Sequence, residues 1–228
     1  MTDVFINVAV MNNVNDVLEK ILDSIYTSGL YDYVDNIYLV INGEIEKLKY
    51  ESREKYKVIN FGPNLDRCEF PTLDLIWEKS KQTEDTKILY LHTKGVSKPN
   101  LLSISDWVDY LIYFNITKWR ERINELNKFD CTGVDLKGNP EDIESHPSFW
   151  GYGKAPLHYS GNFWWSNSKH IKKLTKPTDW LPDDNYFRWR VMAEMWICQE
   201  VSSSYNCVYQ SNNNFYSNRY LREKYEKS

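Results

Sequence analysis

The chain has 228 residues, 42% of them hydrophobic and 15% aromatic, and a formal net charge of −4. This length and apolar content suffice for a sizeable core, so we expect one globular domain. The acidic balance argues against a protein that binds nucleic acid through its phosphates, because such a surface repels them. No run approaches the roughly 20 apolar residues that span a bilayer, and MTDVFINVAV lacks the features of a signal peptide. We therefore expect a cytoplasmic protein without a membrane span.

The first hundred residues alternate between short apolar runs and amphipathic segments. The runs predict strands at 4–10, 34–43, 56–62 and 87–95. Helical spacing predicts one helix from Asn15, which can cap it, to Gly29, and a second that begins near Pro71. Continuous apolar strands joined by helices are typical of a mainly parallel α/β sheet with helices on both faces. The chain has neither G-x-x-x-x-G-K-[ST] nor G-x-G-x-x-G, which disfavours kinases, GTPases and dinucleotide-binding dehydrogenases.

The second half is less regular and more polar. A long amphipathic helix is predicted over 103–126, with Ser103 and Asp106 spaced as a capping box. Further elements are predicted as strands at 129–136 and 157–165 and helices at 167–174 and 183–201. The loop 137–156 is long enough to be a functional loop or lid, and the mixed charges of 218–228 indicate a solvated tail or a last helix.

Cysteine and tryptophan usage adds two expectations. The four cysteines form no C-x-x-C pair and do not cluster with the four histidines, so they are expected to be ordinary thiols rather than zinc ligands. The nine tryptophans are numerous enough to offer flat surfaces for stacking on sugar rings, although a place in the core is the first expectation for any single one.

The strand ILYLH ends on a polar corner formed by His92, Thr93, Lys94 and Gly95. In a parallel α/β sheet, ligands bind beyond the carboxyl ends of the strands. This corner is therefore the first candidate for a functional site.

Several segments together carry a resemblance to a known family. They are LYLHTKGVS (89–97), FNITKWR (114–120), CTGVDL (131–136), HYSGNFWWSNSKHIKKL (158–174) and RWRVMAEMWI (188–197). The chain resembles the small glycosyltransferase domains of large DNA viruses such as the chlorella viruses, and the related bacterial rhamnan-synthesis-type proteins. The resemblance covers about residues 4 to 200, and HTKG and SGNFWW are its most specific pieces.

The resemblance implies a single GT-A-like α/β domain. A nucleotide-diphosphate sugar, for example a UDP-sugar, would bind across the first strands, and a glycan hydroxyl would accept the sugar. It implies a nucleotide-sugar half at about 1–100, an acceptor-side half at about 101–205 and a tail at 206–228. For a viral protein, the expected location is the host cytoplasm.

The sequence departs from the family at the metal position. Many GT-A enzymes hold Mn²⁺ or Mg²⁺ with an Asp-x-Asp pair at the end of the fourth strand, where this chain has His92, Thr93 and Lys94. We hypothesise that Lys94, with His92, stabilises the leaving diphosphate in place of all or part of the metal's role. The alternatives are a solvated lysine beside a structural histidine, and a metal ion held by a carboxylate from elsewhere, with Asp66 the first candidate.

The expected nucleotide-sugar-binding residues follow the ends of the first strands. They are Val10, Asn12, Asn42, Asp66, His92, Thr93 and Lys94. Asparagines at strand ends are also common turn residues, and Asp66 could instead cap local backbone amides.

The expected acceptor-side residues gather around the SGNFWW segment. Gly161 would permit a ligand to approach closely, Ser160 and Asn162 would bind hydroxyls, and one of the two adjacent tryptophans would face the site. The full set is His158, Ser160, Gly161, Asn162, Trp164, Trp165 and Asp135. As alternate residues of the predicted strand, His158, Ser160 and Asn162 would share one face.

An inverting transfer needs a carboxylate that takes the proton of the acceptor hydroxyl, and Glu194 is the first candidate. Asp184, Asp183 and Asp135 compete for this role, and an ion pair with Arg190 is the structural alternative for Glu194. A retaining mechanism would need no such base. Two other classes stay open: a non-catalytic carbohydrate-binding module on the same fold and, more weakly, a glycoside hydrolase, for which no acid pair stands out.

Overall fold

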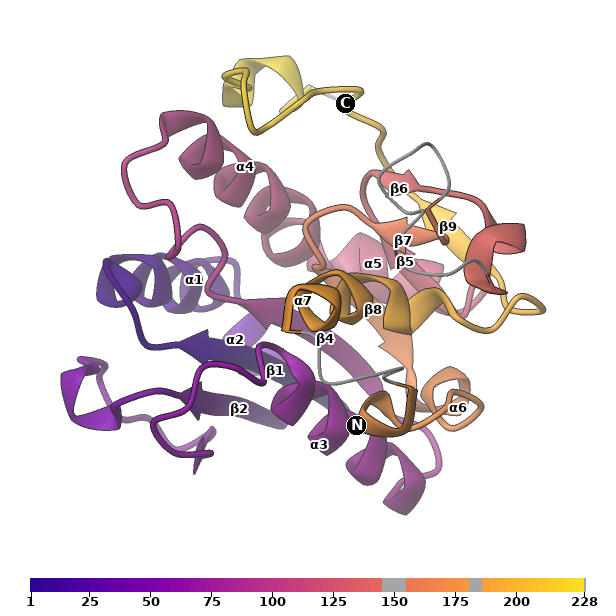
Figure 1. Cartoon of the computed structure of the whole chain (residues 1–228), viewed down its shortest axis with the longest axis horizontal. Helices are drawn as coiled ribbons and strands as arrows, with labels where there is room; N and C mark the ends of the chain where they lie inside the picture. The colour runs from indigo at the N-terminus through magenta and orange to yellow at the C-terminus, as the bar shows by residue number, and fades with distance from the viewer. Residues whose placement is uncertain (145–154, 181–185, 228) are drawn as a thin grey trace.

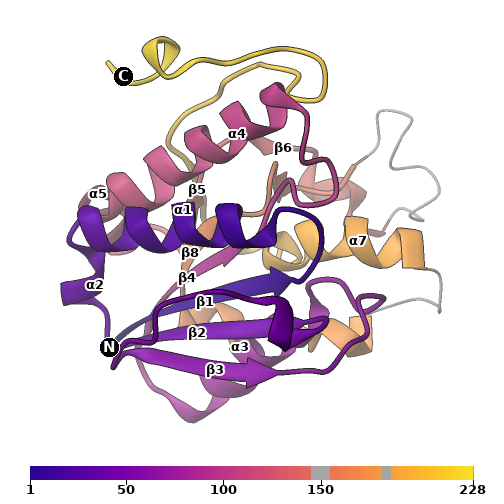
Figure 2. The ribbon, with the colours of Figure 1, turned by 90° about the vertical axis from the view of Figure 1, so that its left-hand side faces the viewer.

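The computed structural model describes residues 1–144, 155–180 and 186–227. The first half of the chain forms four parallel strands, β1 (Thr2–Ala9), β2 (Asn36–Asn42), β3 (Tyr56–Asn60) and β4 (Lys87–His92). They lie side by side in the order β3-β2-β1-β4, as Figure 2 shows for the first three. The direction of the strand order therefore reverses at β1, because β2 and β3 extend the sheet to one side and β4 to the other.

Helices cover both faces of this sheet (Figure 1). On one face lies α1 (Val14–Thr27), followed by the short α2 (Leu30–Tyr33), and on the other lies α3 (Phe70–Gln82) with its proline in the first turn. The Asn15 side chain does not cap α1 but bonds the backbone of Lys47 and Lys49, so the predicted cap is wrong.

Three more strands extend the sheet to seven strands in the described ranges. They are β8 (Trp164–Asn167), antiparallel to β4, β5 (Cys131–Gly133), antiparallel to β8, and β9 (Tyr205–Cys207), parallel to β5. A separate pair consists of β6 (Leu136–Lys137) and β7 (His158–Tyr159). The predicted α/β class, with a mainly parallel sheet flanked by helices, is confirmed.

The helices of the second half differ from the prediction. The segment 103–126 is interrupted, because a π-helical turn at Tyr113–Thr117 separates α4 (Leu102–Ile112) from α5 (Trp119–Glu125). The remaining helices described are α6 (Ser168–Ile171) and α7 (Tyr186–Met195). Short 3₁₀ turns lie at Ile45–Lys47, Pro140–Glu144, Pro177–Trp180, Trp196–Cys198 and Arg222–Lys224.

The predicted strand 157–165 is broken in its middle. β7 ends at Tyr159, and β8 begins only at Trp164. Between them Gly161 and Asn162 have φ values of +94° and +54°, which reverse the chain direction. His158, Ser160 and Asn162 therefore do not share a strand face, and that prediction is wrong.

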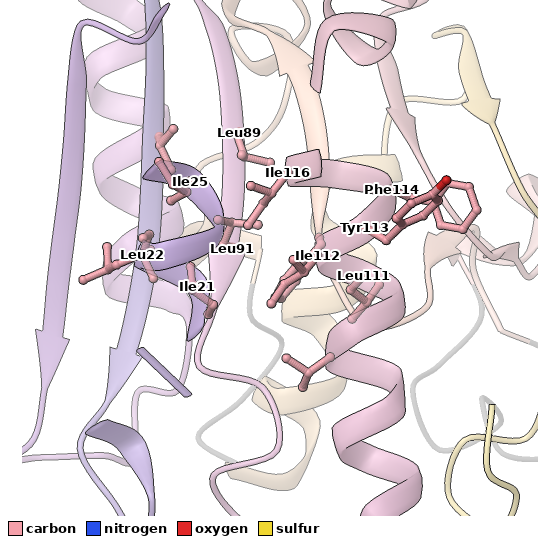
Figure 3. Packing of buried hydrophobic residues seen from close by; sticks show 14 of the residues in the cluster. Ile21, Leu22, Ile25, Leu89, Leu91, Leu111, Ile112, Tyr113, Phe114 and Ile116 are labelled. Carbon is pink, nitrogen blue, oxygen red and sulfur yellow. The ribbon is translucent and has the colours of Figure 1, made fainter. Parts of the chain in front are cut away.

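Alternating side chains divide the core into two layers, one on each face of the sheet. Figure 3 shows one layer, in which Leu89 and Leu91 of β4 meet Ile21 and Ile25 of α1 and Ile116 of the π-helical turn. Trp165 lies in this layer. Trp164 lies in the other layer with Tyr90, as expected for adjacent residues of one strand.

Residues 208–227, which we call the C-terminal strap, are not a solvated tail. They cross over α4 (Figure 2), and Phe215, Tyr220 and Tyr225 are buried against it. Asp106 fixes the strap rather than capping α4, because its carboxylate accepts hydrogen bonds from the Arg219 guanidinium at 2.5 and 3.0 Å and from the Tyr220 amide at 2.9 Å. The predicted capping box is therefore wrong.

We expect Asp106→Asn to loosen the strap and to lower the melting temperature by several degrees, because a charged acceptor with three donors is lost. The hydrogen bonds from Arg219 hold the pKa of Asp106 below its usual range, so the difference should be full at pH values above the unfolded-state pKa and shrink as the carboxyl protonates in acid. Thermal unfolding and limited proteolysis at pH 7 and pH 4 measure it. Asp109→Asn, which removes only a half-exposed pair with Lys20, is the matched control. Equal melting temperatures for the two variants would contradict the prediction.

Candidate functional site

A pocket of about 440 Å³ lies beyond the carboxyl ends of β1, β2 and β4, where the strand order reverses. Its floor is the sheet, and its walls come from the loop before α3, the loop after β4, α4, α7 and the C-terminal strap. Figure 2 shows α7 beside these strand ends. Ligands of open α/β sheets bind at such a reversal point, so this pocket is the candidate functional site.

The polar corner after β4 forms part of the pocket wall. His92, Thr93 and Lys94 all line it. Thr93 is buried, and its hydroxyl accepts a hydrogen bond from the Ala9 amide at 3.0 Å, which ties the ends of β4 and β1 together. Thr93 therefore has a structural role, while its neighbours His92 and Lys94 bring ionisable side chains to the pocket wall.

Lys94 is a buried amine that has no carboxylate partner among the described residues. Its side chain lies across α4, with Nζ 3.8 Å from the centre of the Trp107 ring, and the residue is only 8% exposed. None of the described carboxylates is within ion-pair distance of Nζ. Burial lowers the pKa of Lys94, while Glu194 and Glu69 act in the opposite direction. A charged amine held this way is stabilised by an anion that enters the pocket.

Glu69, which no sequence pattern singles out, is a carboxylate of the pocket wall that two hydrogen bonds hold in place. Its Oε2 accepts hydrogen bonds from the Tyr90 hydroxyl at 2.5 Å and from the side-chain Nδ2 of Asn162 at 2.7 Å. Its Oε1 lies 3.9 Å from Nδ1 of His92. Asp66, three residues earlier, was the expected carboxylate, but it is exposed and does not line the pocket. The loop before α3 thus contributes a different acid from the one predicted.

Glu194 and Arg190 of α7 face the pocket from the opposite side. Among residues whose placement is described, the structure records no ion pair between them, so the structural alternative for Glu194 receives no support. Asp183 and Asp184 lie outside the described residues, as do residues 145–154 of the loop considered as a lid.

Asn42 occupies the end of the pocket nearest β2. Its Nδ2 donates to Oδ1 of Asn7 at 2.7 Å, and the same oxygen accepts from the Thr72 hydroxyl at 2.8 Å. Asn42 Oδ1 is buried and has no hydrogen-bond partner in the part of the chain that is described. Val10 instead packs in the core against Gly43, and exposed Asn12 donates to the Val96 carbonyl, so both lie outside the pocket wall.

The expected acceptor-side residues do not form a ligand-binding surface. Trp164 and Trp165 are fully buried, and their indole N–H groups donate to Asn162 Oδ1 and to the Asn115 carbonyl, so stacking on a sugar is excluded for both. Asp135 is also fully buried, where its carboxylate accepts from Ser211. Both tryptophans are buried because core layers cover both faces of β8. The alternation of side chains along a strand does not show whether a face is covered.

The other acceptor-side candidates have structural roles as well. His158 bonds the Pro156 carbonyl and Ser160 bonds the Asp135 carbonyl, and neither lines the pocket. Asn162 is buried and positions Glu69, and the Gly161 carbonyl lies 3.0 Å from Nε2 of His92. Asn162 and Gly161 thus position Glu69 and His92, the residues that line the pocket.

We expect Gly161→Ala to lower the free energy of unfolding by about 2 to 5 kcal/mol, the sum of backbone strain and overpacking. Its φ is +94°, and an added Cβ would lie 2.8 Å from Leu111 Cδ1 and 3.1 Å from Trp107 Nε1. Gly62→Ala is the matched control, because Gly62 has a φ of +92° with no atom within 4 Å of the added Cβ. Urea denaturation of both variants separates strain from overpacking, and equal losses would rule out the overpacking.

Among the described residues, no group of three His, Cys, Asp or Glu side chains is placed to hold an ion, and Oε2 of Glu69 already accepts two hydrogen bonds. The polar end of β4 offers an amine where a carboxylate pair would be needed.

Neither a family model nor a curated protein matches this chain. None of the helices in the described ranges combines the length and apolar character needed to cross a membrane.

Proposed function

We propose that this protein is a glycosyltransferase that moves a sugar from a nucleotide-diphosphate donor to a glycan hydroxyl. The observation that carries the proposal is Lys94, a buried amine with no described carboxylate partner, in a pocket at the reversal point of a parallel sheet. The resemblance of HTKG and its neighbouring segments to small viral glycosyltransferases supports the same assignment.

In this proposal Lys94 binds the diphosphate. Breaking the bond between the anomeric carbon and the phosphate oxygen leaves negative charge on the diphosphate, and a fixed cation at that position stabilises the transition state. Arg190 and Lys98, which also line the pocket, add positive charge around the same point. No step of this mechanism is assigned to a metal ion.

Asn42 lines the pocket beyond the end of β2, and in this proposal it lies at the nucleoside end of the donor. Glu194, on the opposite wall, is the base that takes the proton of the acceptor hydroxyl as its oxygen attacks the anomeric carbon.

The test is donor turnover. Purified protein is incubated with UDP-, GDP- and dTDP-sugars, with and without Mn²⁺, and release of the nucleoside diphosphate is followed in the presence and absence of glycan acceptors. We expect one nucleotide class to bind and to be turned over. If no nucleotide sugar binds under any condition, the proposal is wrong.

The second candidate, a carbohydrate-binding module without activity, loses its main support in the structure. It relied on tryptophan faces near SGNFWW, and both of those tryptophans are fully buried. Of the tryptophans with described side chains, Trp107 lines the pocket, and one face of its ring is taken by the Lys94 amine.

A further inference from the structure

Two side chains in the pocket wall lie next to each other without a hydrogen bond between them. Glu69 Oε1 and His92 Nδ1 are 3.9 Å apart, and both side chains keep a small exposed fraction, 13% and 14%. Glu69 is held in place through its other oxygen by Tyr90 and Asn162. The position of its Oε1 is therefore fixed by the fold.

The protonation of His92 follows from its second nitrogen. Nε2 lies 3.0 Å from the Gly161 carbonyl, which can only accept, so Nε2 carries the proton in this assignment. Burial lowers the pKa of His92, which favours the neutral ring near pH 7 and leaves Nδ1 as an acceptor. Two acceptors thus lie side by side, and no donor from the described residues reaches either of them.

We propose that Glu69 Oε1 and His92 Nδ1 form a subsite for two neighbouring hydroxyl groups of the transferred sugar. This inference rests on the proposed function. Adjacent hydroxyls of a sugar ring present two O–H donors at about the spacing of one hydrogen-bond length, which matches two acceptors a few ångströms apart. The subsite would make Glu69 a specificity-determining residue that favours sugars carrying that diol.

The test separates the sugar from the nucleotide. Affinities of wild type and Glu69→Gln are measured for a nucleoside diphosphate, for its sugar conjugate and for the conjugate of a deoxy sugar that lacks one hydroxyl of the diol. The glutamine oxygen can still accept from Tyr90 and Asn162, while its amide places a donor beside His92. We expect Glu69→Gln to lower the affinity for the sugar conjugate by about 10- to 100-fold, which is the usual effect of losing a hydrogen bond to a charged group. The affinity for the nucleoside diphosphate should change less than twofold.

The conjugate of the deoxy sugar that lacks the hydroxyl assigned to Glu69 should bind both proteins alike, because that hydrogen bond is absent in both. Unchanged nucleoside diphosphate affinity also shows that the variant is folded. If Glu69→Gln has wild-type affinity for all three ligands, or if its affinity for all three falls equally, the subsite proposal is wrong while the transferase proposal stands. If wild type binds no nucleotide, the proposed function fails, and the subsite fails with it.

Discussion

Replacing Lys94 with methionine is expected to lower the rate of sugar transfer by about 10²- to 10³-fold, the usual cost of removing one preorganised charge-stabilising group. Methionine replaces the apolar stem of the lysine with an unbranched stem of nearly the same length but removes the amine that lies over Trp107. Because burial of that amine is unfavourable in the absence of an anion, stability should stay the same or rise slightly.

The same substitution should weaken nucleoside diphosphate binding, since the amine is proposed to bind the diphosphate in the ground state too. Steady-state transfer rates, nucleotide affinities and urea denaturation together measure the three effects. Lys81→Met is the matched control, because Lys81 also lies over a tryptophan, with Nζ 4.7 Å from the Trp77 ring, but outside the pocket. Full activity in Lys94→Met would exclude the proposed role of Lys94.

The part of the site that the sequence revealed is the part that depends on strand ends. Continuous apolar runs identified β1, β2 and β4, and parallel strands place their carboxyl ends at one edge. The sequence alone therefore predicts that Asn42 and Lys94 line one pocket. Gly95, the last residue of the polar corner after β4, has a φ of +91° and turns the chain away from the pocket floor.

The parts that the sequence did not reveal depend on contacts between distant segments. Glu69 becomes a pocket acid only because Tyr90 and Asn162 orient it, and these residues come from β4 and from the turn before β8. No local spacing signals this meeting. The only hint was the position of the loop before α3 at the carboxyl edge of the sheet, and that hint favoured Asp66 equally.

The C-terminal strap was missed for a related reason. Its buried aromatic residues, Phe215, Tyr220 and Tyr225, are five residues apart, which is neither a helical nor a strand period, and mostly polar residues separate them. Yet Phe215 stacks on Trp107 with ring centres 5.0 Å apart, and Tyr216 lines the pocket. The strap thus supports the ring on which the Lys94 amine lies, so a segment expected to be solvated is part of the pocket's construction.

Replacing Glu194 with glutamine is expected to lower transfer by about 10²- to 10⁴-fold, the range that general base catalysis contributes. The side chain keeps its size and its place on the pocket wall, but it can no longer take the proton of the acceptor hydroxyl. Affinity for the donor and for its nucleoside diphosphate should change only a few-fold, which separates Glu194 from Glu69, whose substitution is expected to affect donor binding.

The transfer rate and the donor affinity are measured for wild type, for Glu194→Gln and for the control variant Glu78→Gln. Glu78 lies on α3 outside the pocket, where it forms an exposed ion pair with Lys176. Its substitution should therefore leave the transfer rate unchanged. Transfer at the wild-type rate in Glu194→Gln would contradict the base role and favour a retaining mechanism, which needs no base on the acceptor hydroxyl. A large loss of stability in this variant would instead assign Glu194 a structural role, in conflict with its unpaired position opposite Lys94 among the described residues.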